Sequence, residues 1–143
     1  MKLRLIFFIF LILTGCNLTY NRQETVPSQR DTIIVIYAQN QTNISTSEKA
    51  VPVLQVLSAC GINMEWEGND NASFEVDGQK FFISIPAIKI CAENSSYNCI
   101  QIPPGTANGF CYAKGNEIYV DIATMKGILF ELKIDADLYI SSE

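Results

Sequence analysis

The chain has 143 residues, of which 48% are hydrophobic and 17% are charged, a balance typical of a chain that folds around one hydrophobic core. Fifteen acidic residues exceed ten basic ones, which argues against nucleic acid as a partner. The sequence contains no histidine, so catalysis by Ser-His-Asp or Cys-His groups and the usual nitrogen ligands of copper are excluded.

Residues 1–15 have the layout of a secretory signal peptide. Lys2 and Arg4 form a basic start, an uninterrupted apolar run follows from Leu5 to Leu13, and small residues come next. The apolar run is about half of the ~20 residues that a helix needs to cross a bilayer, so a permanent transmembrane anchor fits poorly. Removal of this segment would take away two basic residues and no acidic one, which leaves a formal charge of −7.

The four residues from Leu13 to Cys16 read Leu-Thr-Gly-Cys. They resemble the bacterial lipobox, in which the peptide bond before the cysteine is cut after its thiol receives a diacylglycerol. Thr14 and Gly15 are small enough for a peptidase groove, and a thiolate at Cys16 is the soft nucleophile that lipid transfer needs. The resemblance implies a lipoprotein that acyl chains on Cys16, palmitate among them, hold on a membrane. Ordinary secretion with Cys16 in a disulfide is the alternative.

The residue after Cys16 is Asn17 and not Asp. In lipoproteins of two-membrane bacteria an Asp there resembles a signal for the inner membrane, so the expected location is the outer membrane. In a single-membrane bacterium the protein would lie on the outer face of the plasma membrane. Residues 16–31 are mostly polar and lack an apolar period, so we expect a flexible stalk of up to ~50 Å before a single domain at residues 32–143.

The first half of this domain shows a strand, a helix and a hairpin. Residues 32–39 (TIIVIYAQ) are rich in β-branched side chains and predict a buried strand. A short helix is predicted next, from apolar residues at helical spacing: Val53, Leu54, Leu57 and Cys60. Pro52 suits the first turn of this helix, and Gly61 suits the left-handed position that ends it. Alternating apolar residues predict strands at 62–66 and 72–76, and Asp77-Gly78 predicts a hairpin turn before the next strand.

The second half continues with short strands and turns at 92–98, 103–105 and 114–116, and residues 119–141 then repeat the earlier order in shorter form. Asp121 is expected to cap a helix of little more than one turn that Gly127 ends, before alternating residues form strands. The predicted fold class is α+β. It is a small, mostly antiparallel β domain with one short helix per β-α-β-β repeat, in two repeats of which the second is truncated.

Residues 51–76 (VPVLQVLSACGINMEWEGNDNASFEV) resemble the repeat of the copper amine oxidase N-terminal-like domains. In that repeat a strand residue, a proline, a short amphipathic helix, a glycine and an alternating strand with Trp follow one another, as Pro52, Gly61 and Trp66 do here. The resemblance covers about residues 46–141, although the second copy has no proline before its helix and no Trp after it. It implies a module that binds or docks, without copper, because the metal and the reactive tyrosine of that family belong to another domain.

Four cysteines follow Cys16, and an even number in an exported domain favours two disulfides, for which three pairings are possible. Cys91 and Cys99 flank a polar loop between apolar strands, so a bridge there would pin a hairpin. This pairing would leave Cys60, at the helix end, to reach Cys111. A zinc site is the alternative, but the spacings contain no Cys-x-x-Cys pair, and we predict no metal.

Two sets of aromatic residues bear on binding. Trp66, the only tryptophan, is expected in the core beneath the helix, and an exposed anchor for a partner is the alternative. Tyr97, Tyr112 and Tyr119 could form a ligand patch, although single aromatic residues that line strands are the favoured interpretation.

These features together predict a non-catalytic envelope lipoprotein that needs no cofactor. Its partners would be the lipid membrane, through acylated Cys16, and another envelope protein or a cell-wall component. Residues 105–120 (GTANGFCYAKGNEIYV) also resemble the end of the short N-terminal modules of secretins and TonB receptors, where a strand-turn-strand with a Gly-Asn turn precedes the next unit. That resemblance implies, as one alternative, a pilot-like accessory lipoprotein of a secretin, a type IV pilus or a secretion system. Inhibition of an external hydrolase through the loop at 91–99 is another.

Overall fold

The structure, a computed structural model, describes residues 30–47, 49–93, 99–101 and 110–142. The predictions for the signal peptide, for Cys16, for most of the stalk, for Tyr97 and for the turn at 103–105 lie outside these residues. Strand β1 begins at Arg30, two residues before the predicted start of the domain. Of the helices in the described ranges, none has the length and apolar character needed to cross a membrane.

The first sheet contains β1 (Arg30–Tyr37), β2 (Asn40–Ser47) and β11 (Ala136–Ser142), in the order β11-β1-β2 with antiparallel neighbours. The buried strand predicted at 32–39 is confirmed as β1. A two-residue turn at Ala38 and Gln39, both with positive φ, joins β1 to β2. Strand β2 was not predicted, because it is polar throughout except for Ile44.

Helix α2 (Val53–Ala59) follows the short strand β3 (Val51–Pro52) and confirms the predicted helix. Its apolar stripe is buried: Val53, Leu54, Val56 and Leu57. Gly61 has a φ of +77°, the left-handed conformation that was expected where the helix ends.

The second sheet is a five-stranded antiparallel meander. It contains, in sequence order, β4 (Glu65–Glu67), β5 (Asn71–Val76), β6 (Gln79–Ser84), β7 (Lys89–Ala92) and β8 (Cys99–Gln101). Asp77 and Gly78 both have positive φ, which confirms the predicted hairpin turn between β5 and β6. The strand predicted at 62–66 is shorter and begins only at Glu65.

The third sheet contains β3, β10 (Glu117–Val120) and β9 (Cys111–Lys114), in the order β3-β10-β9. Helix α3 (Ile122–Glu131) follows β10, and the side chain of Asp121 caps it by accepting hydrogen bonds from the backbone N–H and the hydroxyl of Thr124. The predicted cap is therefore confirmed. The predicted end of the helix at Gly127 is wrong, because α3 runs through this glycine for a total of ten residues.

The reason for the longer helix is visible in its burial pattern. Met125, Ile128, Leu129 and Leu132 lie at helical spacing and are buried, whereas Phe130 is 80% exposed. Residues 128–131 therefore belong to the helix, whose buried face includes Ile128 and Leu129 but not Phe130, and the strand predicted from the alternation of Ile128, Phe130 and Leu132 is wrong. The strand predicted around Leu138 and Ile140 is confirmed as β11.

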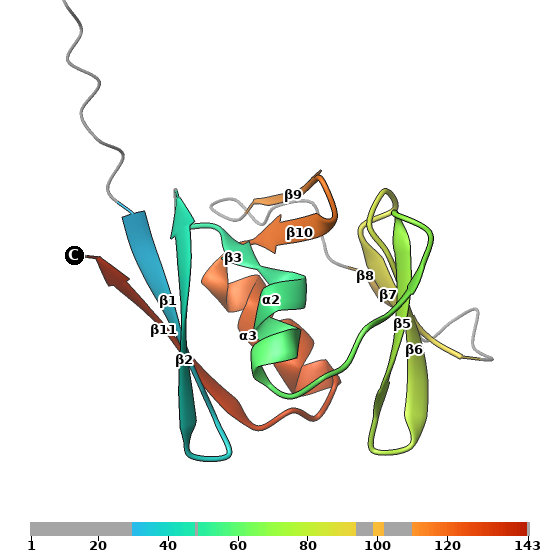
Figure 1. Cartoon of the computed structure of the whole chain (residues 1–143), viewed down its shortest axis with the longest axis horizontal. Helices are drawn as coiled ribbons and strands as arrows, with labels where there is room; N and C mark the ends of the chain where they lie inside the picture. The colour runs from blue at the N-terminus through green and yellow to red at the C-terminus, as the bar shows by residue number, and fades with distance from the viewer. Residues whose placement is uncertain (1–29, 48, 94–98, 102–109, 143) are drawn as a thin grey trace, which may run out of the picture.

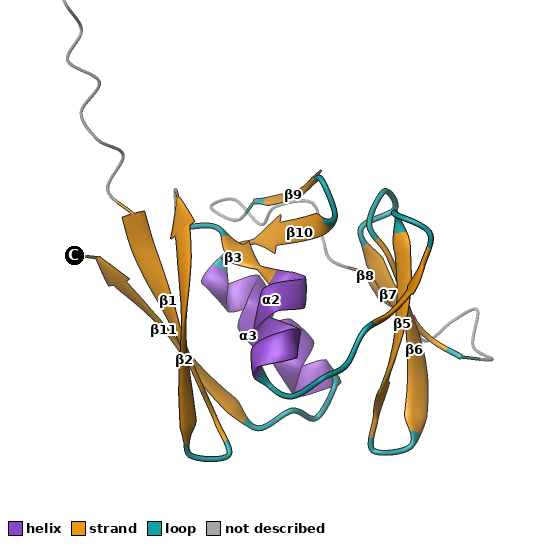
Figure 2. Ribbon diagram, viewed as in Figure 1, coloured by secondary structure: helices purple, strands orange, loops and turns teal. Residues whose placement is uncertain are grey.

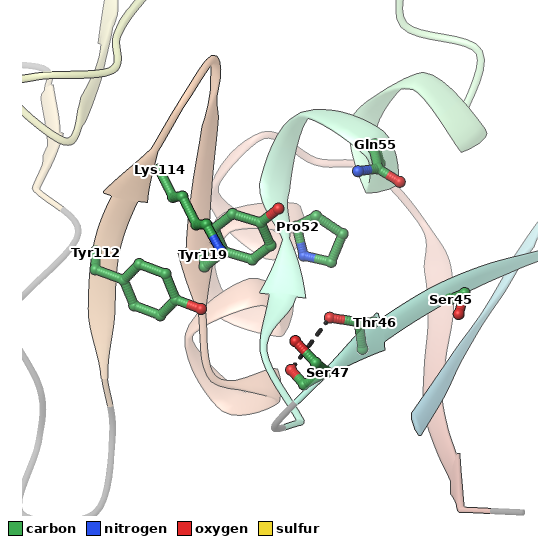
Figure 3. A pocket seen from close by; sticks show the side chains of 8 residues that line it. All are labelled: Ser45, Thr46, Ser47, Pro52, Gln55, Tyr112, Lys114 and Tyr119. Carbon is green, nitrogen blue, oxygen red and sulfur yellow. Dashed lines mark hydrogen bonds between the residues drawn. The ribbon is translucent and has the colours of Figure 1, made fainter. Parts of the chain in front are cut away.

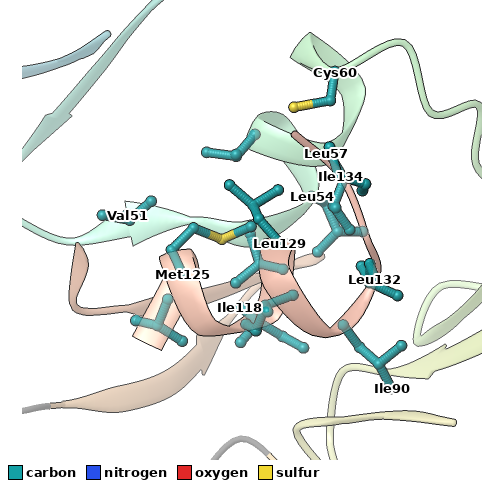
Figure 4. Close-up of a cluster of buried hydrophobic side chains, with 14 of the residues drawn as sticks. Val51, Leu54, Leu57, Cys60, Ile90, Ile118, Met125, Leu129, Leu132 and Ile134 are labelled. Atoms are coloured by element: carbon teal, nitrogen blue, oxygen red, sulfur yellow. The ribbon is translucent and has the colours of Figure 1, made fainter. Parts of the chain in front are cut away.

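The two helices lie between the sheet of β1, β2 and β11 and the five-stranded sheet, while β3, β9 and β10 cover one end (Figures 1 and 2). One cluster of buried side chains joins these elements, with contributions from Ile33 of β1, Leu57 of α2, Ile90 of β7 and Met125 of α3. Figure 4 shows side chains of this core converging from both helices and the surrounding strands. The described residues are mostly antiparallel strands with two helices, which confirms a small α+β fold.

Trp66 is 45% exposed, so its predicted place in the core is wrong. It lies on β4, which among the described strands pairs with β5 alone, and it stands opposite Ala72. Ala72 and Ile83 continue the same row toward the middle of the sheet and are buried there. Trp66 is thus the outermost member of a core-facing row, and α2 does not cover it.

Candidate functional site

Two adjoining cavities follow strand β2 where it passes helix α2. One has a volume of about 400 Å³ and is shown in Figure 3; its lining residues come from β2, from the start of α2 and from β9 and β10: Ser45, Thr46, Ser47, Pro52, Gln55, Tyr112, Lys114 and Tyr119. The other, of about 670 Å³, is lined by Thr42, Asn43, Ile44, Ser45, Gln55, Ser58 and Ala59. Ser45 and Gln55 line both cavities, so the two adjoin, and we call them together the β2 groove.

A row of ring side chains borders one end of the β2 groove. The strand register places Pro52 opposite Tyr119 and Tyr119 opposite Tyr112. The rings of Tyr112 and Tyr119 are stacked, with 5.1 Å between their centroids and 14° between their planes (Figure 3). Phe110 extends the row, its centroid 6.0 Å from that of Tyr112. Tyr112 and Tyr119 therefore form a contiguous aromatic surface, as the ligand-patch interpretation requires.

Glu117 fixes β10 to the start of α2, and both elements contribute lining residues to the groove. Its buried carboxylate accepts hydrogen bonds from the backbone N–H groups of Leu54 (2.8 Å), Gln55 (3.3 Å) and Ile118 (2.9 Å). Helix α2 has no side-chain cap of its own, because Pro52 occupies the N-cap position, so the carboxylate from β10 caps it instead. Burial raises the pKa of Glu117, and the hydrogen bonds to the carboxylate oppose that shift.

The outer edge of β2 forms the other wall of the groove. The residues that flank a two-residue hairpin turn, here Tyr37 and Asn40, form a hydrogen-bonded pair. Along antiparallel strands such pairs alternate with pairs that exchange no hydrogen bonds. The N–H and C=O groups of Gln41, Asn43 and Ser45 therefore point away from β1. No strand in the described part of the chain pairs with this edge.

The composition of β2 leaves its edge open to another strand. It has no lysine and no proline, the residues that natural proteins often place on an edge strand to prevent pairing. Apolar alternation does not predict this strand, because Ile44 is its one apolar residue. The available signal was β-branched alternation at Thr42, Ile44 and Thr46, directly after the strand at 32–39.

The cysteine predictions have mixed outcomes. Cys91 and Cys99 face each other on β7 and β8 and form a disulfide, as predicted. Cys60 and Cys111, which were expected to form the second bridge, are instead free thiols among the described cysteines. Burial raises the pKa of Cys60. The pKa of Cys111 is raised mainly by burial and also by the negative charge of Asp121.

The second bridge does not form because Cys60 follows the last residue of α2, whereas Cys111 lies on β9, two strands from the strand that precedes this helix. Val120 pairs with Val51 on one side and with Cys111 on the other, so Cys111 is two strands away from the residue that leads into the helix. The seven residues of α2 then carry the chain ~10 Å farther before Cys60. A disulfide requires Cα atoms within ~7 Å.

Within the described ranges, no three His, Cys, Asp or Glu side chains gather where they could hold a metal ion. The β2 groove offers hydroxyl and amide groups, a tyrosine pair and one ammonium group, Lys114. Such groups form hydrogen bonds and aromatic contacts with a ligand. Comparison of the chain with protein-family models, curated proteins and solved structures found no match.

Proposed function

We propose that this protein is a non-catalytic, lipid-anchored module of the bacterial cell envelope that docks another envelope protein or a cell-wall component through the β2 groove. The observation that carries the docking function is that the edge of β2, with which no described strand pairs, lies in one groove with the stacked Tyr112–Tyr119 pair. Hydrogen-bonding groups with a specific direction and a flat aromatic surface together suit the recognition of a partner.

The anchor in this proposal is the acylated thiol of Cys16, which the Leu-Thr-Gly-Cys sequence supports. The outer membrane is the proposed location, since Asn17 and not Asp follows the cysteine. A Cys16→Ser variant tests the anchor and should lose acylation, cleavage before residue 16 and partition with membranes. A Cys111→Ser variant serves as the control and should keep all three. Cleavage and membrane partition that persist in the Cys16→Ser variant would contradict the proposal.

Docking through the groove can be tested with a photo-crosslinking amino acid in whole cells. At Gln55, which is exposed and lines both cavities, the crosslinker should form an adduct with a defined envelope component. At Phe130, which is exposed on α3 and outside both cavities, it should not. Adducts only at Phe130 would place the docking surface elsewhere and overturn the assignment to the groove.

The fold itself supports the two-repeat arrangement that we propose for this module. Strands β3 and β10 pair with each other, and each leads directly into a helix, α2 or α3. The first unit then continues into β4 and β5, and the second continues only into β11, which agrees with a truncated second copy. This order is the one that the resemblance to copper amine oxidase N-terminal-like domains implies, and the proposed module needs no copper.

The pilot-like accessory lipoprotein is the second candidate. Strands β9 and β10 with their turn at Gly115-Asn116 lead directly into α3, as the resemblance to secretin and TonB-receptor modules implies. Neighbouring genes for a secretin or a pilus, together with a crosslink from Gln55 to such a component, would favour this candidate. The disulfide that ties β7 to β8 favours the inhibitor alternative, which inhibition assays with cell-wall hydrolases can test.

A further inference from the structure

The β2 groove has the hydrogen-bonding groups of a site for one added strand. Gln41, Asn43 and Ser45 each present an N–H and a C=O to the free edge, at the spacing with which an antiparallel partner exchanges bonds. These three residues span ~14 Å, the length of five residues of an extended chain. At the far end, the backbone C=O of Ser47 already accepts a hydrogen bond from the N–H of Ala50, so the open part of the edge stops there.

The charge of the groove restricts what the added strand can carry. Lys114 is the only charged side chain among the residues that line the two cavities, and it lies at the Ser47 end. The rest of the protein is acidic, which disfavours a partner segment with a run of acidic residues. A single carboxylate beside Lys114 satisfies both conditions. In an antiparallel strand this end of the groove receives the N-terminal part of the added segment.

We propose that the edge of β2 binds an extended segment of a partner protein as an antiparallel β-strand, with one Asp or Glu near the N-terminal end of that segment beside Lys114. This inference rests on the proposed docking function and names the kind of partner that fits the groove. A second copy of the chain fits less well, because β2 itself contains no charged residue that could meet Lys114. Backbone pairing supplies the affinity, and the carboxylate supplies the register.

The test uses the full chain and a blocked peptide as long as β2, with alternating Val and Thr and one Glu at its N-terminal end. Hydrogen exchange measured by NMR should show new protection at the amides of Gln41, Asn43 and Ser45. The amides of Thr42 and Ile44 already bond to β1 and should change little. A peptide of the same composition with its Glu at the C-terminal end should bind more weakly, by about two- to fivefold for one exposed ion pair.

Two pairs of variants separate backbone pairing from side-chain contacts. Ser45→Pro removes an outward N–H at a position where an edge strand tolerates proline, and it should weaken binding by about tenfold or more. Ser45→Ala removes the hydroxyl but keeps the N–H, so it should lose much less affinity than Ser45→Pro. Lys114→Glu should weaken binding of the Glu peptide and improve binding of a peptide with Lys in its place.

Several results would overturn the proposal that β2 binds an added strand of a partner protein. Absence of new protection on β2 would do so, as would equal binding of the Ser45→Pro and Ser45→Ala variants. Protection already present without peptide, in a dimer that Ser45→Pro converts to a monomer, would identify a second copy as the occupant. If the peptide fails while the adduct at Gln55 persists, docking through the groove stands and only strand addition is lost. If both fail, the docking function falls as well.

Discussion

The carboxylate of Glu117 accepts a hydrogen bond from the backbone N–H of Leu54 at 2.8 Å, although 63 positions separate the two residues in the chain. This bond joins strand β10 to the start of helix α2. Gln55, next to Leu54, and Tyr119, two residues after Glu117, both line the β2 groove. One buried carboxylate therefore sets both the position of a helix and the shape of the candidate site.

Replacement of Glu117 should destabilise the fold, and the loss should be larger when the new side chain keeps no oxygen that can accept the backbone hydrogen bonds. Glu117→Ala leaves the N–H groups of Leu54 and Gln55 without their acceptor and should lower the free energy of unfolding by about 1–3 kcal/mol. Glu117→Gln keeps one oxygen, which can still bond to Leu54 and Ile118, and should cost less. Urea unfolding measures both variants, and equal losses would show that the carboxylate caps nothing.

The pH dependence of stability provides a separate prediction for Glu117. Burial raises its pKa in the folded protein, so the folded state binds more protons than the unfolded state at pH values above the ordinary Glu pKa. Its contribution to stability is fully present below the unfolded pKa of about 4.3 and is lost as the pH rises through the folded pKa. Unfolding free energies measured between pH 4 and 8 should decline less steeply in Glu117→Gln than in the original protein.

The cap of α3 has the opposite pH dependence. Partial burial raises the pKa of Asp121, but hydrogen bonds from the side chain and backbone N–H of Thr124 outweigh burial and lower it. The stabilisation is present above the unfolded pKa and is lost as the pH falls through the folded pKa. Asp121→Ala should cost ~1 kcal/mol in thermal or urea unfolding, and Asp121→Ser should restore most of it. A Ser variant as unstable as Ala would contradict the capping role.

Trp66 should report its exposure by fluorescence. Because this residue is 45% exposed, its native emission should be red-shifted and iodide should quench it before unfolding. Trp66→Ala should change stability by less than about 1 kcal/mol. Ile90→Ala, at a fully buried position of the five-stranded sheet, should cost ~2–5 kcal/mol and serves as the comparison. A blue-shifted, unquenched native spectrum would show that Trp66 is covered.

Alkylation followed by mass spectrometry should distinguish the cysteines of the folded protein. Cys111 is only half-buried and should react first, while Cys60 in the core should react only on unfolding. Cys91 and Cys99 should remain unlabelled until a reductant is added. Their replacement by Ala should cost about 2–3 kcal/mol in the loop-entropy account of a disulfide. A Cys60–Cys111 crosslinked peptide in the native digest would contradict this assignment.

Neighbouring residues decided several features, and these could be predicted from the sequence. The β-branched run of β1 prefers an extended backbone, the Asp77-Gly78 pair accepts positive φ, and Asp121 bonds to an N–H three residues away. The Cys91–Cys99 bridge also follows from a short polar loop between two strands. Each of these preferences acts within a few residues, so the sequence contains all the information that the prediction needs.

Segments far apart in the chain decided the rest. Strand β2 forms because β1 offers it a hydrogen-bonding partner, and Phe130 belongs to a helix because the faces around it are buried against other elements. Trp66 is exposed because its strand lies at the edge of the sheet, a position that depends on all five strands. The Glu117–Leu54 bond likewise exists only once β3 and β10 pair. The amino-acid sequence by itself therefore determined the local elements, whereas the β2 groove arises only in the tertiary structure, because its walls come from β2, α2, β9 and β10.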